Sequence, residues 1–252
     1  LSSKLEFTIS ELKTANNELQ KDIEQKVQID EMRKEFLSHV SHELKTPIAL
    51  IQGYAEGLKE GVAADKESFD FYCDVIMDES NKMNRMVKNL LSLDHIESGQ
   101  NNINIERFNL TELINEICKA NELRLDQKNI VCVSKCQNDI YVWYDKLQIE
   151  EVFTNFYTNA INHSTGKIKI SLKKTDGKAK LEVYNSGNKI PEKDLTRIWE
   201  KFYKVDKART REYGGNGLGL SIVKAILDNY DVEYGVYNVD DGVVFWCMFD
   251  CD

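Results

Sequence analysis

The stretch Phe36-Leu-Ser-His-Val-Ser-His-Glu-Leu-Lys-Thr-Pro47 decides how the first part of the chain is interpreted. His42 and Thr46 stand four residues apart in it, which puts both side chains on one face of a helix, one turn from each other. The polar residues of the stretch alternate with apolar ones, which we expect to point into a helical bundle. Pro47 lacks a backbone N–H donor, so we expect the helix to bend just after this group.

His42 has the chemistry of a phosphoryl acceptor, because a neutral imidazole is a nucleophile near neutral pH. Glu43 can accept a hydrogen bond from the imidazole N–H, fix its tautomer and take the released proton. Thr46 can hold a water molecule for the reverse chemistry, the hydrolysis of a phosphoryl group. A single histidine on a helix is more often structural, and nothing around His39 or His95 suggests chemistry. The assignment to His42 therefore depends on the whole stretch.

An apolar stripe of helical period surrounds this stretch. Leu5, Leu12 and Leu19 recur every seven residues between charged and amide side chains, which predicts a coiled coil over residues 1–30. The stripe continues as far as Tyr54. The N-terminal part is therefore predicted to be one long helix.

A second helix follows, with a turn expected over residues 57–66. Its apolar positions run from Phe69 to Leu90, and Gly99 supplies a stop signal. The two helices form a hairpin over residues 31–99 that cannot bury both of its apolar faces alone. We therefore expect two copies to pair as a dimeric four-helix bundle, with a dimerisation stalk that has no chemistry as the alternative.

The residues after this hairpin have a different pattern. We expect a polar linker over 100–106 and a separate α/β domain over 107–252. A helix is expected to begin with a cap at Asn109, and Asp176-Gly177 is a hairpin turn signal. The other expected elements are strands at 130–134, 140–144, 167–174, 180–185, 232–237 and 243–250, and helices at 145–163 and from 219 to 229. This order predicts a two-layer α/β sandwich with helices on one face of a sheet.

The composition limits the classes of function. The chain has 252 residues, 42% of them hydrophobic, and a net charge of −9, which argues against a general nucleic-acid binder. No run of 18 apolar residues occurs, so no membrane span is expected. The six cysteines form no Cys-x-x-Cys pair, so we expect reduced thiols rather than a metal site.

Three asparagines on the helix expected at 145–163 form a candidate ligand site. Asn155, Asn159 and Asn162 are spaced by four and three residues, which places them on one face. Asparagine carbonyls are hard oxygen ligands and suit Mg²⁺ bridging to phosphates, and we expect Asn159 to carry the metal. A solvated face is the alternative, and the apolar residues between the asparagines argue against it.

The stretch Gly215-Asn-Gly-Leu-Gly219 opens the next helix. Glycines let backbone N–H groups approach phosphates, and the N-terminus of a helix favours their charge. The stretch is neither a P-loop nor a dinucleotide-binding fingerprint, because the flanking residues and elements differ. We therefore interpret it as a phosphate cradle.

Five motifs in this order resemble those of the sensor histidine kinases of two-component systems. The stretch 36–47 resembles their H box, and the asparagine helix resembles the N box of the GHKL-type ATP-binding domain, a fold shared with gyrase and MutL. Val183–Pro191 resembles the first glycine box and Ile198–Lys204 the F box, while Gly215–Gly219 resembles the second glycine box. The chain departs from the first glycine box, with Asn185 in place of Asp and Lys189 in place of Gly.

The resemblance implies an ATP- and Mg²⁺-dependent autokinase that phosphorylates its own His42 with the help of Glu43, while Thr46 serves the reverse, hydrolytic chemistry. The phosphoryl group then passes from His42 to an aspartate of a response-regulator receiver domain. A phosphatase activity toward that regulator is also expected. A homodimer is implied, with no nucleic-acid partner. The implied nucleotide-site residues are Asn155, Asn159, Asn162, His163, Asn185, Gly187, Phe202, Lys204, Gly215, Gly217, Leu218 and Gly219.

The resemblance also implies that this chain is the cytoplasmic portion of a membrane-anchored bacterial protein, with its sensor region upstream. Two other functions stay open. An ATPase-driven clamp like the gyrase relatives needs no nucleophile at His42, and it uses a glutamate where Asn155 stands. A dimeric scaffold without turnover is kept open by Asn185 and Lys189.

Overall fold

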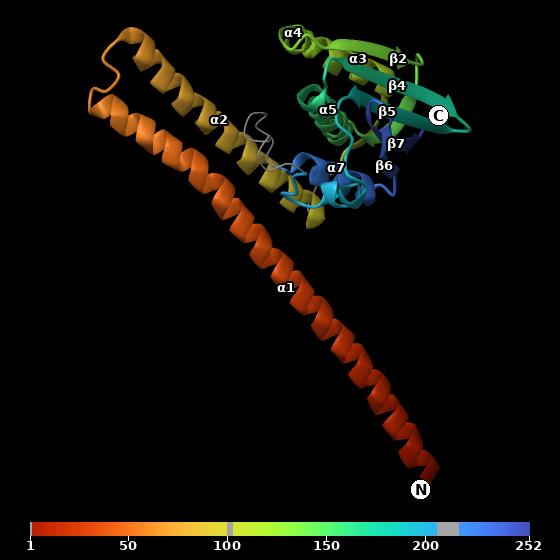
Figure 1. The fold of residues 1–252 in the computed structure, drawn as a ribbon. Helices are drawn as coiled ribbons and strands as arrows, with labels where there is room; N and C mark the ends of the chain where they lie inside the picture. Colours follow the sequence, from red (N-terminus) through yellow and green to blue (C-terminus); the bar gives the residue numbers. More distant parts are fainter. Residues whose placement is uncertain (1, 100–102, 206–216) are drawn as a thin grey trace. The chain divides into compact units, whose positions relative to one another are not determined.

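The computed structural model describes residues 2–99, 103–205 and 217–252 (Figure 1). The side chains of residues 2–6, 8–11 and 15 also lie outside the described part. The predicted heptad residue Leu5 and the predicted site residue Gly215 are therefore not described. The chain divides into two compact units, Leu1–Met83 and Asn84–Asp252, and each is considered by itself.

The first unit confirms the predicted helical hairpin. Helix α1 spans Ser2–Lys59 and runs through Pro47 without a break, and α2, which spans Lys66–Glu97, begins in this unit. The connection is shorter than predicted, because Gly57 belongs to α1. A Cβ at Gly57 would lie 2.6 Å from Cε1 of Tyr72 on α2, so a residue without a side chain lets the helices approach.

An apolar face of α1 is not covered by the described part of its own chain. Leu12, Leu19, Ile23 and Met32 are each between 59% and 64% exposed. Apolar surface on this scale is unfavourable in water at roughly 25 cal/mol per Å². The predicted coiled-coil face is therefore present on the helix and available for pairing.

The second unit is a two-layer α/β structure, as predicted. Its main sheet has the order β2-β4-β5-β7-β6, in which β2 and β4 are parallel and the other neighbours antiparallel. A separate pair, β1 with β3, is antiparallel. The strands are β1 Ile105–Asn109, β2 Val131–Cys136, β3 Tyr141–Asp145, β4 Lys167–Thr175, β5 Lys178–Ser186, β6 Glu233–Val239 and β7 Gly242–Asp250.

The helices of this unit cover one face of the main sheet (Figure 1). They are α3 Leu110–Ala120, α4 Glu122–Gln127, α5 Lys146–His163 and α7 Gly219–Asn229, with short 3-10 turns at Glu192–Asp194 and Arg197–Trp199. In β4, Ile168, Ile170 and Leu172 are buried, as their alternation predicted. The sequence did not predict α4 or the two short turns.

Polar caps fix where the two main helices of the unit begin. The side chain of Asn109 accepts hydrogen bonds from the backbone N–H groups of Thr111 and Glu112, as predicted for α3. Asp145 accepts from those of Leu147 and Gln148 at the start of α5. These caps set the register of α5, and with it the direction of its asparagines.

The predicted linker over 100–106 was wrong at its end. Ile105 and Glu106 belong to β1 and pair with Asp145 and Tyr144 of β3. The folded domain therefore begins earlier than predicted. The polar composition around these two residues had suggested a linker, but their backbones pair with a neighbouring strand. The boundaries predicted for the functional domains otherwise stay predictions.

All six cysteines, each within the described residues, are free thiols. Burial raises the pKa of the Cys118 thiol to about 12, with the nearby Cys132 and Cys136 as smaller causes. It also raises the pKa of Cys247, which is fully buried. Cys118 and Cys247 are therefore protonated at neutral pH. No described helix is long and apolar enough for a membrane crossing.

The first prediction concerns the close packing at the start of β7. A Cβ at Gly242 would lie 2.0 Å from the carbonyl oxygen of Asn185, which is backbone and can yield only if β5 shifts. We expect Gly242→Ala to lower the free energy of unfolding by about 1–3 kcal/mol. Urea unfolding followed by tryptophan fluorescence measures this, because Trp143, Trp199 and Trp246 all lie in the second unit.

Gly177→Asn is the matched control in the neighbouring hairpin. Gly177 has φ +76°, which asparagine tolerates, and an added Cβ there meets no atom within 4 Å. We expect this variant to lose less than half as much stability. Equal losses in the two variants would contradict the packing explanation.

Candidate functional site

The predicted phosphoryl acceptor lies on α1 in the first unit. His42 and Thr46 are exposed, while Glu43 is half-buried. Ser41, one residue before the histidine, donates from Oγ to the carbonyl oxygen of Leu37 at 2.8 Å, which ties that side chain to its own helix. The imidazole of His42 is thus accessible to a reactant, with its neighbouring carboxylate on the same helix.

The predicted nucleotide residues lie in the second unit, and α5 is their centre. Asn155, Asn159 and Asn162 are all half-buried, between the buried face of α5 and solvent. Asn155 donates from Nδ2 to the carbonyl oxygen of Glu151 at 3.0 Å, which turns its Oδ1 away from that carbonyl. None of the three side chains is fully exposed, which argues against the alternative of a solvated face.

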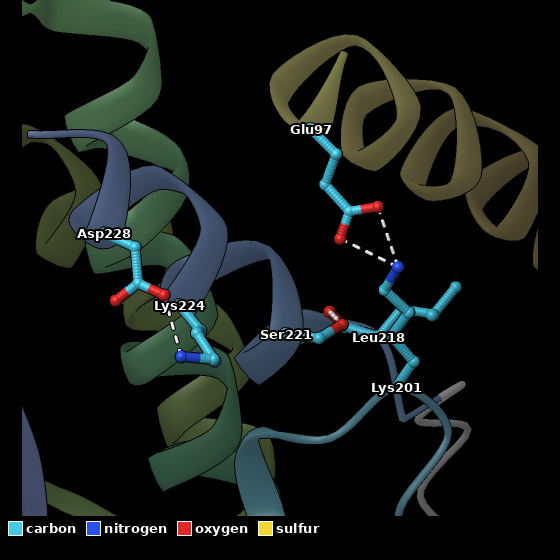
Figure 2. Close-up of polar contacts among 6 residues, drawn as sticks. All are labelled: Glu97, Lys201, Leu218, Ser221, Lys224 and Asp228. Carbon is cyan, nitrogen blue, oxygen red and sulfur yellow. Dashed lines mark hydrogen bonds and ion pairs between the residues drawn. The ribbon is translucent and has the colours of Figure 1, made fainter. Parts of the chain in front are cut away.

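The glycine-rich start of α7 packs directly on Asn155. A Cβ at Gly219 would lie 2.6 Å from Asn155 Oδ1, so only glycine admits this approach without a shift. Leu218, just before it, is fully buried, and Ser221 Oγ donates to the Leu218 carbonyl oxygen at 2.8 Å (Figure 2). The start of α7 is therefore fixed against α5, as the predicted phosphate cradle requires.

Phe202 joins the F-box stretch to the same glycine segment. Its backbone N–H donates to the carbonyl oxygen of Gly217 at 2.8 Å. A Cβ at Gly217 would lie 2.9 Å from Cα of Phe202, and Gly217 has φ +69°. Phe202 itself has φ 61°, which is uncommon for a bulky residue and marks a constrained backbone. The structure thus brings together two of the predicted motifs.

The first glycine box contacts the other end of α5. Gly187 has φ +143°, and a Cβ there would lie 2.6 Å from the carbonyl oxygen of His163. Asn185 is 3% exposed, and its Nδ2 donates to the carbonyl oxygen of Ser186 at 3.3 Å. This bond uses the side-chain NH₂ group of Asn185, so its side-chain oxygen points away from Ser186. His163 is exposed as a residue, yet the protein around its ring lowers its imidazole pKa, with Lys128 a smaller cause.

Asn162 has a different environment from the one predicted. Its Oδ1 accepts hydrogen bonds from Nη2 of Arg124 at 2.9 Å and from Nζ of Lys128 at 3.3 Å. The oxygen is therefore occupied by two cations and is not directed at a metal ion. The sequence analysis missed both cations, because α4 was not predicted and the contacts join residues 38 and 34 positions apart.

The end of α2 docks on the elements around this site. Ser92 Oγ lies 3.2 Å from Oε2 of Glu151, one turn before Asn155 on α5. Glu97 forms an ion pair of 2.7 Å with Lys201, the neighbour of Phe202 (Figure 2). The last turns of α2 therefore hold both α5 and the F-box stretch. Figure 2 also shows the pair Lys224–Asp228, which lies along α7.

A magnesium site here depends on amide oxygens and on the phosphates of a ligand. Among the described residues, no three His, Cys, Asp or Glu side chains gather in a way that suits a metal ion. Asn159 lies between Asn155 and Asn162 on the half-buried face of α5. An amide oxygen there fits Mg²⁺, which keeps several waters and is bound largely through phosphates.

Comparison with known proteins assigns both units. Residues 144–251 match the family described as histidine kinase-, DNA gyrase B-, and HSP90-like ATPase, and residues 32–99 match the His Kinase A (phospho-acceptor) domain. A sensor protein kinase WalK of Staphylococcus aureus is 33% identical over 237 residues, which are 92% of this chain and 57% of that protein. The chain spans 39% of the WalK protein of strain USA300.

Solved structures of histidine kinases are also similar to this chain. The catalytic domain of histidine kinase ThkA is 32% identical, with 58% of this chain and 95% of that one covered and a TM-score of 0.53. ThkA in complex with the response regulator protein TrrA is 30% identical, covers 85% of this chain and 60% of that one, and has a TM-score of 0.70. Histidine kinase AdeS of Acinetobacter baumannii is 27% identical, with 84% of this chain and 98% of that one covered, and has a TM-score of 0.68.

The second prediction concerns Glu151. Burial raises the pKa of its carboxyl, and the hydrogen bond from Ser92 partly lowers it. A raised pKa favours the folded state most below the unfolded pKa, and this advantage is lost as the pH rises through the folded pKa. Ser92→Ala removes a hydrogen bond to the charged form, so the pKa of Glu151 should rise further. We expect the second unit to lose about 1 kcal/mol near neutral pH.

The loss should shrink as the pH falls toward about 4, where the carboxyl is protonated in the folded and the unfolded chain. Urea unfolding at several pH values measures it. Ser98→Ala is the control, because the Ser98 hydroxyl donates to the carbonyl oxygen of His95, on its own helix, at 3.3 Å. A pH-independent loss in Ser92→Ala would argue against the contact with Glu151.

Proposed function

The chain belongs to the sensor histidine kinase family, and we propose on that basis that it phosphorylates its own His42 from ATP. The observation that carries the proposal is the meeting of the motifs around α5. Asn155 contacts the glycine start of α7, and His163 contacts Gly187 of the first glycine box. These segments are far apart in the sequence, and a nucleotide site is the function that explains their convergence.

The acceptor step follows from the chemistry of the exposed imidazole. One ring nitrogen of His42 attacks the γ-phosphorus of ATP, an N–P bond forms, and the bond from that phosphorus to the bridging oxygen of ADP breaks. Glu43 accepts the N–H of the ring, which keeps the attacking nitrogen unprotonated and stabilises the positive charge that develops. The half-buried position of Glu43 strengthens this effect, because its charge is less screened by water.

In the nucleotide site, we assign Asn159 to Mg²⁺, which neutralises charge on the phosphates when bound. Asn155 positions the start of α7, whose backbone N–H groups face the phosphates. An amide cannot deprotonate water, so hydrolysis of ATP in this site is slow. This favours phosphoryl transfer to histidine over the ATPase-driven clamp, in which a glutamate activates water.

The onward steps belong to the same proposal. The phosphoryl group passes from His42 to an aspartate of a response-regulator receiver domain, and ThkA, a relative, has been solved with such a regulator. Two copies pair through the exposed apolar face of α1, because a coiled coil with the second copy buries it. A sensor region and a membrane anchor outside this chain complete the protein.

The third prediction tests the acceptor. Incubated with γ-labelled ATP, the wild-type chain should incorporate acid-labile, alkali-stable label, and His42→Ala should lose essentially all of it, because the imidazole that would form the N–P bond is removed. His95→Ala, an exposed histidine on α2, is the control and should label like wild type. Normal labelling of His42→Ala would exclude the assignment.

The fourth prediction separates a phosphatase activity from the kinase. Thr46 is exposed one helical turn beyond His42, so its hydroxyl can orient a water for in-line attack on a receiver's phospho-aspartate. The forward reaction needs no such water. We expect Thr46→Ala to keep autophosphorylation within several-fold of wild type and to slow dephosphorylation of the regulator at least about tenfold.

Both rates are measured on one preparation, with Thr46→Ser as the control that keeps the hydroxyl. The competing explanation is that Thr46 only shapes the helix before Pro47. In that case both activities would fall together, and a parallel loss would remove Thr46 from the phosphatase reaction.

A further inference from the structure

Two cations converge on one amide oxygen where α4 meets the C-terminal end of α5. Arg124 lies on α4, and Lys128 caps the end of that helix. Both donate to Oδ1 of Asn162, at 2.9 Å and 3.3 Å. None of the motifs that identify the family includes either cation.

The direction of the Asn162 amide follows from these partners. Guanidinium and ammonium groups only donate hydrogen bonds, so the side-chain oxygen must face them and the NH₂ group must face away. Arg124 keeps further N–H donors beyond the one used here. The corner therefore presents donors and positive charge, which is the surface an anion needs.

The positive charges of Arg124 and Lys128 repel each other. Burial and, next, the charge of Arg124 lower the pKa of Lys128. Arg124 is half-buried, and its Nη2 donates to the neutral amide of Asn162. A phosphate group beside the two cations would offset this repulsion.

The corner belongs to the same face of α5 as the rest of the site. Asn162 follows Asn155 by seven residues, which is two helical turns, and Asn155 lies against Gly219. The next residue, His163, lies against Gly187. An anionic ligand seated along this face would therefore meet the glycine start of α7 at one end and the two cations at the other.

We infer that Arg124 and Lys128 bind the phosphate chain of the nucleotide, and that Asn162 positions them instead of binding the nucleotide itself. The inference rests on the proposed function, because it presumes that ATP binds along α5. It changes the role predicted for Asn162 and adds Arg124 as a residue that distinguishes a charged nucleotide from a neutral nucleoside.

A purely structural role makes a different prediction. Cations near the C-terminal end of a helix stabilise its dipole, and Arg124 and Lys128 stand near the end of α5. Removing one of them would then lower stability and weaken all ligands alike. An effect confined to phosphate-bearing ligands distinguishes the two roles.

The test compares ATP with adenosine on the whole chain. Arg124→Gln keeps an amide that can donate to Asn162 and removes the charge. We expect its Kd for ATP with Mg²⁺, measured by calorimetry, to rise about tenfold or more, since a hydrogen bond to a charged group is lost. Its Kd for adenosine, measured by NMR titration, should change less than about twofold, because adenosine carries no phosphate.

Two further variants sharpen the comparison. Arg124→Lys keeps a charge without the planar fork and should restore part of the affinity for ATP. Arg107 lies on β1 and forms an ion pair of 2.9 Å with Asp252. The control variant Arg107→Gln should therefore bind ATP like wild type. Thermal unfolding of each variant reports whether the fold is retained.

The outcomes are separable. Failure of the wild-type chain to bind ATP contradicts the proposed function, and the inference with it. If wild type binds ATP and Arg124→Gln binds it equally well, the proposed function stands and the inference is wrong. Equal weakening of ATP and adenosine in Arg124→Gln assigns the cations a structural role and also overturns the inference.

Discussion

The approach of Gly219 to Asn155 is the contact on which the rest of the second unit depends. An added Cβ at residue 219 would lie 2.6 Å from the asparagine oxygen, so α7 can begin there only with a glycine. This contact places the backbone of the glycine segment beside the amide face of α5, while the opposite face is buried with Phe153, Phe156 and other core residues. One helix thus serves both as the core of the domain and as one wall of the site.

The helical hairpin and most strands were predictable from the sequence, because apolar residues of helical or alternating period report directly on burial. Ile168, Ile170 and Leu172 illustrate this for β4. The errors lie where local composition and long-range pairing disagree. Ile105 follows polar residues and was assigned to the linker, yet its backbone pairs with Asp145, forty positions further along the chain.

The sequence predicted a set of candidate site residues, but it predicted few of the contacts among them. The motifs predicted that Asn155 faces the glycine segment, and Gly219 does lie against Asn155. Asn162 is an example of a contact that was missed. Its side-chain oxygen accepts a hydrogen bond from Arg124, 38 positions away, and no local sequence pattern predicts that partner. The ion pair between Glu97 and Lys201 joins residues 104 positions apart, and the sequence did not predict it either.

The central claim is that a nucleotide bound in the second unit delivers its γ-phosphoryl group to the exposed imidazole on α1. The most direct measurement is to incubate the unaltered chain with ATP and Mg²⁺ and to map the phosphate by mass spectrometry with electron-based fragmentation at neutral pH. The account predicts one phosphoryl group, on His42. Phosphate released only to solvent, or attached to another residue, would contradict it, and release alone would instead indicate an ATPase of the clamp type.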